Sequence, residues 1–272
     1  MGTLYLVATP IGNLEDMSPR AVRILREAQL IAAEDTRQSK KLLTHFDIHT
    51  PLTSYFEHNK LGKLEAVIDK LNEGNVALIS DAGTPALNDP GYELVCAAVN
   101  AGHRVSPIPG PASPIAALTV SGLPTDTFLY LGYLPRKSVE RKKVLLNVAN
   151  LPYTLVFLET PHRLLDALKD LEEILDDRQI ALARELTKLH EEIWRGTPGE
   201  ARKYFIAPRG EFVLVVTGKM KDGKEKWKEK KLLAALRRRT KAGESPSALA
   251  AKLSMESGWA RRDIYKLITQ RD

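Results

Sequence analysis

The sequence predicts an α/β fold with two α/β domains, followed by a small C-terminal helical domain. Short apolar runs alternate with helical patterns up to residue 121, which is typical of a mostly parallel sheet. A break rich in Gly, Pro and Asp at 122–126 precedes a second series of apolar runs with fewer helices, which indicates a mixed sheet. The remaining residues are rich in Lys and Arg. We therefore expect domains at 1–122, 123–219 and 220–272.

The first series predicts four strands, each followed by a loop. We expect these strands at 4–8, 30–33, 76–80 and 104–108. The helix at 19–28 has the clearest start, because Ser18 can cap it and Pro19 suits its first position. Further helices are expected at 60–73, 91–101 and 111–121. In such sheets ligands bind beyond the carboxyl ends of the strands.

The second series predicts four more strands and one long helix. The strands are expected at 128–132, 154–158, 179–183 and 211–216, and the helix at 162–175. The lysine-rich segment 221–231 indicates a linker or a helix start. Two further helices, at 246–257 and 260–268 with a turn at Gly258, predict a unit similar to a helix-turn-helix.

The composition is that of a globular protein expected to remain in the cytosol. The chain has 272 residues, of which 43% are hydrophobic and 27% charged. Cys96 is the single cysteine, so no intrachain disulfide can form, and its apolar neighbours favour a buried structural residue over a catalytic thiol. The apolar stretch at the start is too short for a signal peptide or a membrane span.

Positive charge is concentrated at the C-terminal end. Residues 1–217 carry a net charge of −3, whereas residues 218–272 carry +9. A nearly neutral body with a basic extension favours a polyanionic partner for that extension, although a solvated basic surface without a partner is the plainer alternative.

Four loops at predicted strand ends have the composition of a binding site. Three of them lie at 8–13, 80–91 and 107–114, and the fourth is a set of two charged segments in the second series, 159–163 and 184–191. The second combines glycines, two prolines and two carboxylates, which allows close approach of backbone to a flat ligand. Each loop has a purely structural alternative: a rigid turn, a helix start, or carboxylates and bases that pair with each other.

Several common catalytic motifs are absent from the sequence. It contains neither the Gly-x-Gly-x-x-Gly dinucleotide motif nor a Walker phosphate-binding loop, and no Gly-x-Ser-x-Gly nucleophile motif. The six histidines show no spacing typical of zinc sites, so we expect no metal. Dehydrogenase, P-loop and serine-hydrolase functions are therefore disfavoured.

Five motifs in order resemble the ribosomal RNA small subunit methyltransferase I family, within the tetrapyrrole methylase (class III methyltransferase) superfamily. They are Val7–Asp16, Ala33–Arg37, Ile79–Pro85, Pro109–Ser113 with Ser121–Pro124, and Glu159–Arg163. The resemblance runs from about residue 3 to 219. Asp81-Ala82-Gly83 replaces the Gly-Asp-Pro common in the wider superfamily, which fits the RNA branch and disfavours a tetrapyrrole substrate.

The resemblance implies transfer of a methyl group from S-adenosylmethionine to the ribose 2′-hydroxyl of a cytidine in the decoding region of 16S ribosomal RNA. It also implies a homodimer that holds the donor between two α/β domains. By similarity, the donor would contact Pro10, Asp81, Ala82, Gly83, Thr84, Ser113 and Pro114 on one side, and Leu158, Ala183 and Gly210 with Arg209 on the other.

Proton removal and phosphate binding suggest further candidates. A ribose hydroxyl is a poor nucleophile until its proton leaves, so a carboxylate or a lysine of lowered pKa is needed beside it. The candidates at predicted strand ends are Asp35, Glu159 and Lys188, each with a structural ion pair as the alternative. Phosphates are expected to contact Arg37, Arg163 and Arg184, and, in the extension, Arg237, Arg238, Arg239, Arg261, Arg262 and Lys266.

Two other functions remain open at this point. A methylase acting on a tetrapyrrole or another small acceptor would not need the basic extension. A non-enzymatic RNA-binding or ribosome-assembly protein would keep the fold but would not bind S-adenosylmethionine.

Overall fold

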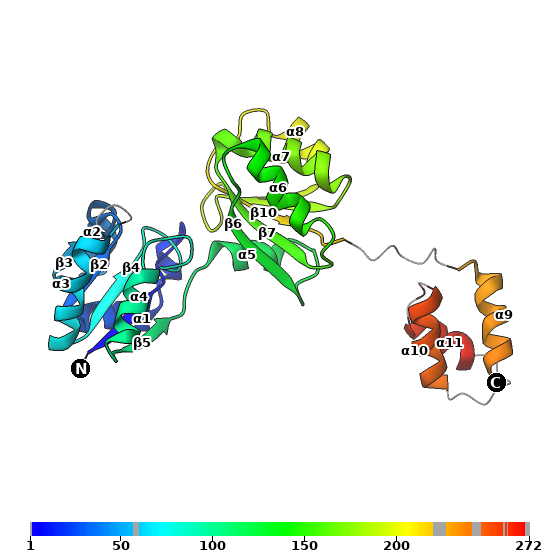
Figure 1. Cartoon of the computed structure of the whole chain (residues 1–272), viewed down its shortest axis with the longest axis horizontal. Helices are drawn as coiled ribbons and strands as arrows, with labels where there is room; N and C mark the ends of the chain where they lie inside the picture. Colours follow the sequence, from blue (N-terminus) through cyan, green and yellow to red (C-terminus); the bar gives the residue numbers. More distant parts are fainter. Residues whose placement is uncertain are drawn as a thin grey trace. The chain divides into compact units, whose positions relative to one another are not determined.

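The computed structural model describes residues 2–56, 60–219, 227–240, 246–257, 259 and 261–269. The chain forms two compact units (Figure 1). The first comprises Met1–Ala149 and Tyr153–Thr217, and the second Asn150–Pro152 and Gly218–Asp272. In the described residues, no helix combines the length and apolar character needed to cross a membrane.

The first sheet has five parallel strands in the order β3-β2-β4-β1-β5. The strands are β1 Thr3–Val7, β2 Leu30–Ala33, β3 Leu52–Ser54, β4 Val76–Ile79 and β5 Arg104–Ile108. The predicted parallel sheet and its four predicted strands are confirmed. The short edge strand β3 was not predicted.

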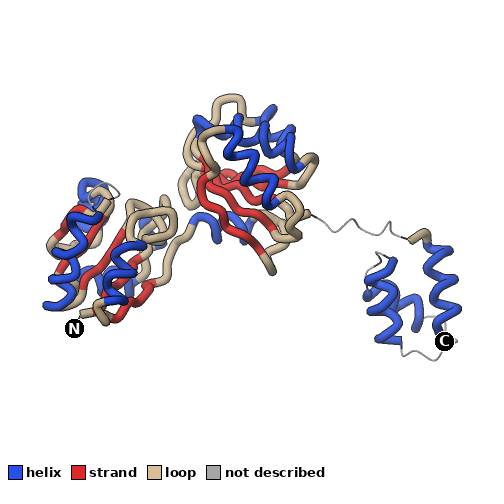
Figure 2. The backbone as a smooth tube through the Cα atoms, viewed as in Figure 1, coloured by secondary structure: helices blue, strands red, loops and turns tan. Residues whose placement is uncertain are grey.

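Helices cover this sheet on both faces, as Figure 2 shows. They are α1 Pro19–Glu27, α2 Thr36–His45, α3 Lys60–Glu73 and α4 Tyr92–Asn100, with the 3-10 helix η1 Leu14–Asp16 before α1. One core contains α1 and α2 residues such as Leu25 and Leu43, and the other contains α3 and α4 residues such as Leu71 and Leu94. The start of α1 is as expected, because the Ser18 side chain accepts a hydrogen bond from the Ala21 amide.

The second sheet is mixed, as predicted, and has the order β6-β7-β10-β8-β9. The strands are β6 Phe128–Tyr133, β7 Thr154–Glu159, β8 Ile180–Arg184, β9 Glu192–Gly196 and β10 Phe212–Val216. Only the β6 and β7 pair is parallel, and β10 runs antiparallel to both of its neighbours. The edge strand β9 was not predicted.

Four helices pack on this sheet: α5 Ser113–Val120, α6 Ser138–Val148, α7 Pro161–Leu175 and α8 Pro198–Tyr204. Figure 1 shows α5 on one face and α6, α7 and α8 on the other. Ala117 and Leu118 of α5 join a core with alternate residues of β7, β8 and β10. The helix expected at the end of the first series therefore belongs to the second sheet, and the predicted boundary at residue 122 stays a prediction.

The C-terminal unit contains α9 Glu229–Thr240, α10 Pro246–Ser257 and α11 Arg261–Thr269. Its small core is formed by Leu232, Leu236, Leu249, Ala250, Leu253 and Ile264. The two expected helices after residue 245 are confirmed, and a helix begins within the predicted lysine-rich segment, at Glu229. The predicted turn residue Gly258 lies outside the described residues.

Candidate active site

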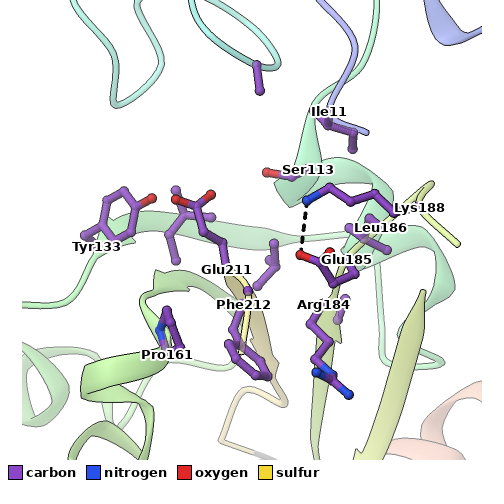
Figure 3. A pocket seen from close by; sticks show the side chains of 15 residues that line it. Ile11, Ser113, Tyr133, Pro161, Arg184, Glu185, Leu186, Lys188, Glu211 and Phe212 are labelled. Atoms are coloured by element: carbon purple, nitrogen blue, oxygen red, sulfur yellow. Dashed lines mark hydrogen bonds and ion pairs between the residues drawn. The ribbon is translucent and has the colours of Figure 1, made fainter. Parts of the chain in front are cut away.

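The carboxyl ends of three strands of the second sheet meet at one edge. β10 is antiparallel to β7 and β8, so its first residues lie at that same edge. A pocket of about 390 Å³ opens there, which is within the usual size range of small-molecule sites. Ile11 and Ala82, from the loops after β1 and β4, and Ser113, the first residue of α5, complete its wall. Figure 3 shows Ile11 and Ser113.

An ion pair occupies one wall of the pocket. The Lys188 ammonium lies 3.1 Å from the Glu185 carboxylate, and Figure 3 shows both side chains beside Ser113. A Cβ atom at Gly12 would come within 2.4 Å of Lys188 Cγ and 2.9 Å of the Leu186 carbonyl oxygen. A Cβ at Gly210 would come within 2.4 Å of the Glu185 carboxylate. Two glycines thus make room for this pair.

The loop that carries the pair is held in an unusual backbone conformation. Glu185 has φ of 51° and Thr187 has φ of 65°, a left-handed region that side chains other than glycine rarely adopt. The Glu191 carboxylate accepts a hydrogen bond from the Thr187 amide at 2.7 Å and so stabilises the turn. Such strained conformations cluster at functional sites.

The opposite wall holds Tyr133 and Glu211, whose polar groups point toward each other in Figure 3. Burial, together with the nearby carboxylates of Glu211 and Asp89, raises the pKa of Tyr133 to about 12. The phenol therefore keeps its proton at neutral pH and remains a hydrogen-bond donor. Between the two polar walls the lining is largely apolar, with Leu158, Ala183, Leu186, Phe212 and Val213.

A cluster of carboxylates lies at the ends of β2 and β4. The Asp35 amide donates to the Asp81 carboxylate at 3.1 Å, and Asp35 in turn pairs with Arg37 at 2.8 Å. The hydrogen bonds from Arg37 lower the pKa of Asp35 to about 2. Burial raises the pKa of Asp89 to about 6, and it also raises the pKa of Glu34 and of Asp81.

The structure brings seven of the candidate site residues to the pocket. These are Ala82, Ser113, Leu158, Ala183, Gly210, Arg184 and Lys188. Pro10 and Asp81 line a separate hollow of about 360 Å³ beside α2.

Three of the residues expected to contact the donor, Gly83, Thr84 and Pro114, do not line the pocket but stabilise the loops that form it. The backbone of Gly83 pairs with Thr9, and the Thr84 hydroxyl donates to the Pro111 carbonyl at 3.1 Å. Pro114 is buried in α5.

Two of the three proton-acceptor candidates do not line the pocket. Asp35 caps α2 and pairs with Arg37, and Glu159 is fully buried at the end of β7. The Glu159 carboxylate accepts from the Thr160 amide at 2.8 Å and pairs with Arg163 at 3.1 Å. Burial raises the pKa of Glu159. For both residues the structure matches the ion-pair alternative.

The arginines expected to bind phosphates differ in their ion pairing and exposure. Arg163 is engaged by Glu159 and by the Leu134 carbonyl, and Arg184 pairs with Glu192 beside the pocket. Arg37 is paired, but its side chain is 88% exposed.

In the C-terminal unit, the described basic candidates are mostly exposed. Arg237, Arg238 and Lys266 are exposed, whereas Arg239 pairs with Glu256 at 2.9 Å. The side chains of Arg261 and Arg262 lie outside the described residues.

Sequence reasoning missed Tyr133, Glu185 and Glu211 as pocket residues. Each lies at a predicted strand end or within two positions of one, which is the signal that could have identified them. Cys96, expected to be a structural residue, is half-buried in α4. Within the described ranges, no group of three or more His, Cys, Asp or Glu side chains is arranged to hold a metal ion.

Comparisons with known proteins agree with this architecture. Residues 3–202 match the family model of Tetrapyrrole (Corrin/Porphyrin) Methylases. The chain is 47% identical to a Synechocystis protein named ribosomal RNA small subunit methyltransferase I, over 98% of this chain and 97% of that protein. It is 46% identical to the protein of that name from Halalkalibacterium halodurans, over 99% of this chain and 95% of that one.

Solved structures share the fold at low sequence identity. The methyltransferase CobJ superposes with a TM-score of 0.61 at 19% identity, covering 80% of this chain and 95% of that one. Uroporphyrin III C-methyltransferase from Thermus thermophilus gives a TM-score of 0.57 at 19% identity, covering 80% and 97%. The chain is thus 46–47% identical to these two relatives over nearly its full length, and the family model covers most of it. It therefore belongs to the tetrapyrrole methylase family and, within it, to the ribosomal RNA small subunit methyltransferase I group.

Proposed function

We propose that this protein transfers a methyl group from S-adenosylmethionine to the ribose 2′-hydroxyl of cytidine 1402 in 16S ribosomal RNA. Its relatives are named ribosomal RNA small subunit methyltransferase I, which supports a small-subunit ribosomal RNA substrate. The observation that carries the proposal is the pocket at the strand ends, which combines a largely apolar lining with two polar walls. Action as a homodimer in the cytoplasm is part of the same proposal.

The pocket residues fit the donor. An adenine ring needs a flat apolar surface, which Leu158, Ala183 and Val213 can provide, whereas ribose hydroxyls and the amino acid group need polar partners. Ala82, Ser113 and Gly210 would hold the polar part, and Pro10, Asp81, Gly83, Thr84 and Pro114 would shape the loops behind them. When bound, the donor supplies an electrophilic methyl group on a sulfonium.

The residues of the chain have two tasks: to orient the acceptor ribose and to take its proton. Lys188 is the proposed catalytic residue, since of Asp35, Glu159 and Lys188 it alone lines the pocket. Glu185, 3.1 Å away, holds the Lys188 side chain in place and can take the ammonium proton, so that the neutral amine then accepts the proton of the ribose hydroxyl. Alignment of oxygen, carbon and sulfur supplies the remainder of the rate enhancement.

Direct methylation of ribosomal subunits tests this function. Small subunits from cells lacking the gene are incubated with the protein and radiolabelled S-adenosylmethionine, and the modified nucleotide is mapped by mass spectrometry of nuclease fragments. We expect one 2′-O-methylcytidine per subunit. Labelling of no ribosomal RNA, with methylation of a tetrapyrrole instead, would favour the small-acceptor alternative; no binding of the donor would favour a non-enzymatic protein.

The C-terminal unit is proposed to contact the RNA backbone. Its exposed Arg237, Arg238 and Lys266 support this role, together with the net charge of +9 over residues 218–272. Arg239, Arg261 and Arg262 belong to the same proposal. Phosphate contacts of this kind position a protein on RNA without reading sequence.

A further inference from the structure

We infer that the segment Leu134–Lys137 is a second RNA-contact surface at the pocket rim, in which Arg136 and Lys137 bind phosphates that flank the target nucleotide. The inference rests on the proposed function, because it assumes an RNA substrate. Neither residue belongs to the C-terminal unit or to the polar walls of the pocket. The segment joins β6 to α6 and follows Tyr133, which lines the pocket.

Two arginines hold the backbone of this segment. Arg141 is 3% exposed, and its guanidinium donates to the Pro135 carbonyl at 3.3 Å and the Arg136 carbonyl at 3.1 Å. Arg163 donates to the Leu134 carbonyl. Three consecutive carbonyl groups are therefore fixed by two planar guanidinium groups.

Each of these arginines has a buried carboxylate partner. Arg141 Nε donates to Asp170 at 2.7 Å, and Asp170 also accepts from the Ser138 hydroxyl at 2.9 Å. Arg163 pairs with the fully buried Glu159. Burying two ion pairs is costly and gives little net stability, whereas such pairs can fix one conformation. A plain connection between a strand and a helix needs no such arrangement, so we infer that the position of this segment matters.

The fixed backbone directs basic side chains to solvent. Arg136 and Lys137 are exposed, and the Lys137 ammonium lies 3.7 Å from the Glu140 carboxylate, which is also exposed. Asp170 neutralises the buried Arg141, and Glu173 pairs with Lys142. The exposed basic side chains of residues 134–143 are therefore Arg136, Lys137 and Lys143, against the exposed carboxylate of Glu140, within a body of 217 residues whose net charge is −3. The positive charge here is thus local, and it complements the phosphates of an RNA strand.

The distance from the pocket suits a neighbouring nucleotide. Arg136 is three residues from Tyr133, so their Cα atoms lie within about 11 Å of each other even in a fully extended chain. A long arginine side chain extends this reach. A nucleotide placed at the pocket would therefore bring its adjoining phosphates to Arg136 and Lys137.

The test compares a surface variant with a matched control. Arg136→Gln/Lys137→Gln removes two charges from exposed positions. Lys70→Gln/Arg104→Gln removes two exposed charges of the first unit, one in the last turn of α3 and one at the amino end of β5, away from the carboxyl strand ends that face the pocket. Binding of 16S ribosomal RNA is measured by filter retention across salt concentrations, without the donor, and methylation kinetics are measured separately.

We expect the surface variant to bind RNA about 10-fold more weakly, with a log-log salt slope reduced by about 1.4, which corresponds to two phosphate contacts on a single strand. KM for RNA should rise to a similar extent, whereas kcat and the dissociation constant of S-adenosylmethionine should stay unchanged. The control should match the parent protein. Unchanged RNA affinity and salt slope in the surface variant would overturn the inference.

Arg141→Lys tests the positioning role separately. It keeps the charge but loses the fork that reaches two carbonyls, so KM for RNA should rise several-fold with kcat unchanged. Asp170→Asn should have the same direction of effect. If Arg141→Lys does not fold, the surface variant still decides. The parent protein could bind 16S RNA through these residues and yet methylate nothing. That result would contradict the proposed function but would still support this RNA-contact surface.

Discussion

The position of the Lys188 side chain depends on close contacts of the backbone around it. Gly12 lies so near that an added Cβ would meet the Leu186 carbonyl oxygen at 2.9 Å, which cannot move away as a flexible side chain can. Gly12→Ala should therefore displace the loop that carries Lys188. We expect a loss of methylation with a native far-UV circular dichroism spectrum, and full activity would show that the loop position is unimportant.

Replacing Lys188 tests the proton-transfer role. Lys188→Ala should lower kcat about 100-fold, the lower end of general acid–base contributions. Lys188→Arg should be almost as inactive, because a guanidinium keeps its proton at any accessible pH. Single-turnover methylation of small subunits measures both. Activity near that of the parent in the arginine variant would mean that Lys188 acts as a charge, and unchanged turnover in the alanine variant would remove it from the mechanism.

Asp89 predicts a pH dependence of stability. Its folded pKa is about 6 and its ordinary value is 3.8, so the folded state binds a proton more tightly than the unfolded chain. The stabilising contribution is complete below about pH 4 and is lost as the pH rises through 6. Asp89→Asn should therefore melt at a higher temperature than the parent at pH 8, and the difference should vanish near pH 4. An equal difference at both pH values would contradict this.

At the scale of elements, the sequence predicted α1 from its cap but missed α2 and α8, although Asp35 and Thr197 cap them, and it also missed α6. The start of α1 was predicted from Ser18 and Pro19, and both act as expected. By contrast, α6 escaped prediction because one of its buried positions is Arg141, which breaks the apolar periodicity. The edge strands β3 and β9 are only half-buried and lack a regular apolar alternation.

The cap of α1 gives a prediction at this scale. Ser18→Ala removes the hydrogen bond to the Ala21 amide and should lower the free energy of unfolding by about 1 kcal/mol. Ser18→Asp keeps an acceptor at the cap and should restore most of the loss. Urea denaturation followed by circular dichroism measures both. Equal stability of the alanine and aspartate variants would show that the cap contributes nothing.

At the scale of the whole molecule, the charge distribution separates RNA binding from donor binding. Truncation after Lys219 removes α9, α10 and α11 but leaves every residue of the pocket. We expect the truncated protein to bind S-adenosylmethionine as before and RNA more weakly, with a flatter salt dependence. The full-length variant Arg237→Gln/Arg238→Gln should show a smaller effect in the same direction. Unchanged RNA binding in both would assign the extension another role.

The sequence predicted the loops of the candidate site better than their assembly. Strand ends marked Ala82, Ser113 and Lys188, which all line the pocket. It could not tell that Tyr133 faces Glu211, because these residues are far apart in the sequence and meet only through the reversal of β10. Nor could it show that Glu159 forms an ion pair with Arg163, because two opposite charges four residues apart have the same sequence pattern whether they are paired or free.

The place of β10 has a consequence for biosynthesis. Among the described residues it is the last strand to leave the ribosome, and yet it lies between β7 and β8 in the middle of its sheet. A nascent chain that stops before Phe212 has two unpaired strand edges and lacks the residues that close the base of the pocket. The pocket is therefore completed late in translation, once nearly all of the first compact unit has emerged from the exit tunnel.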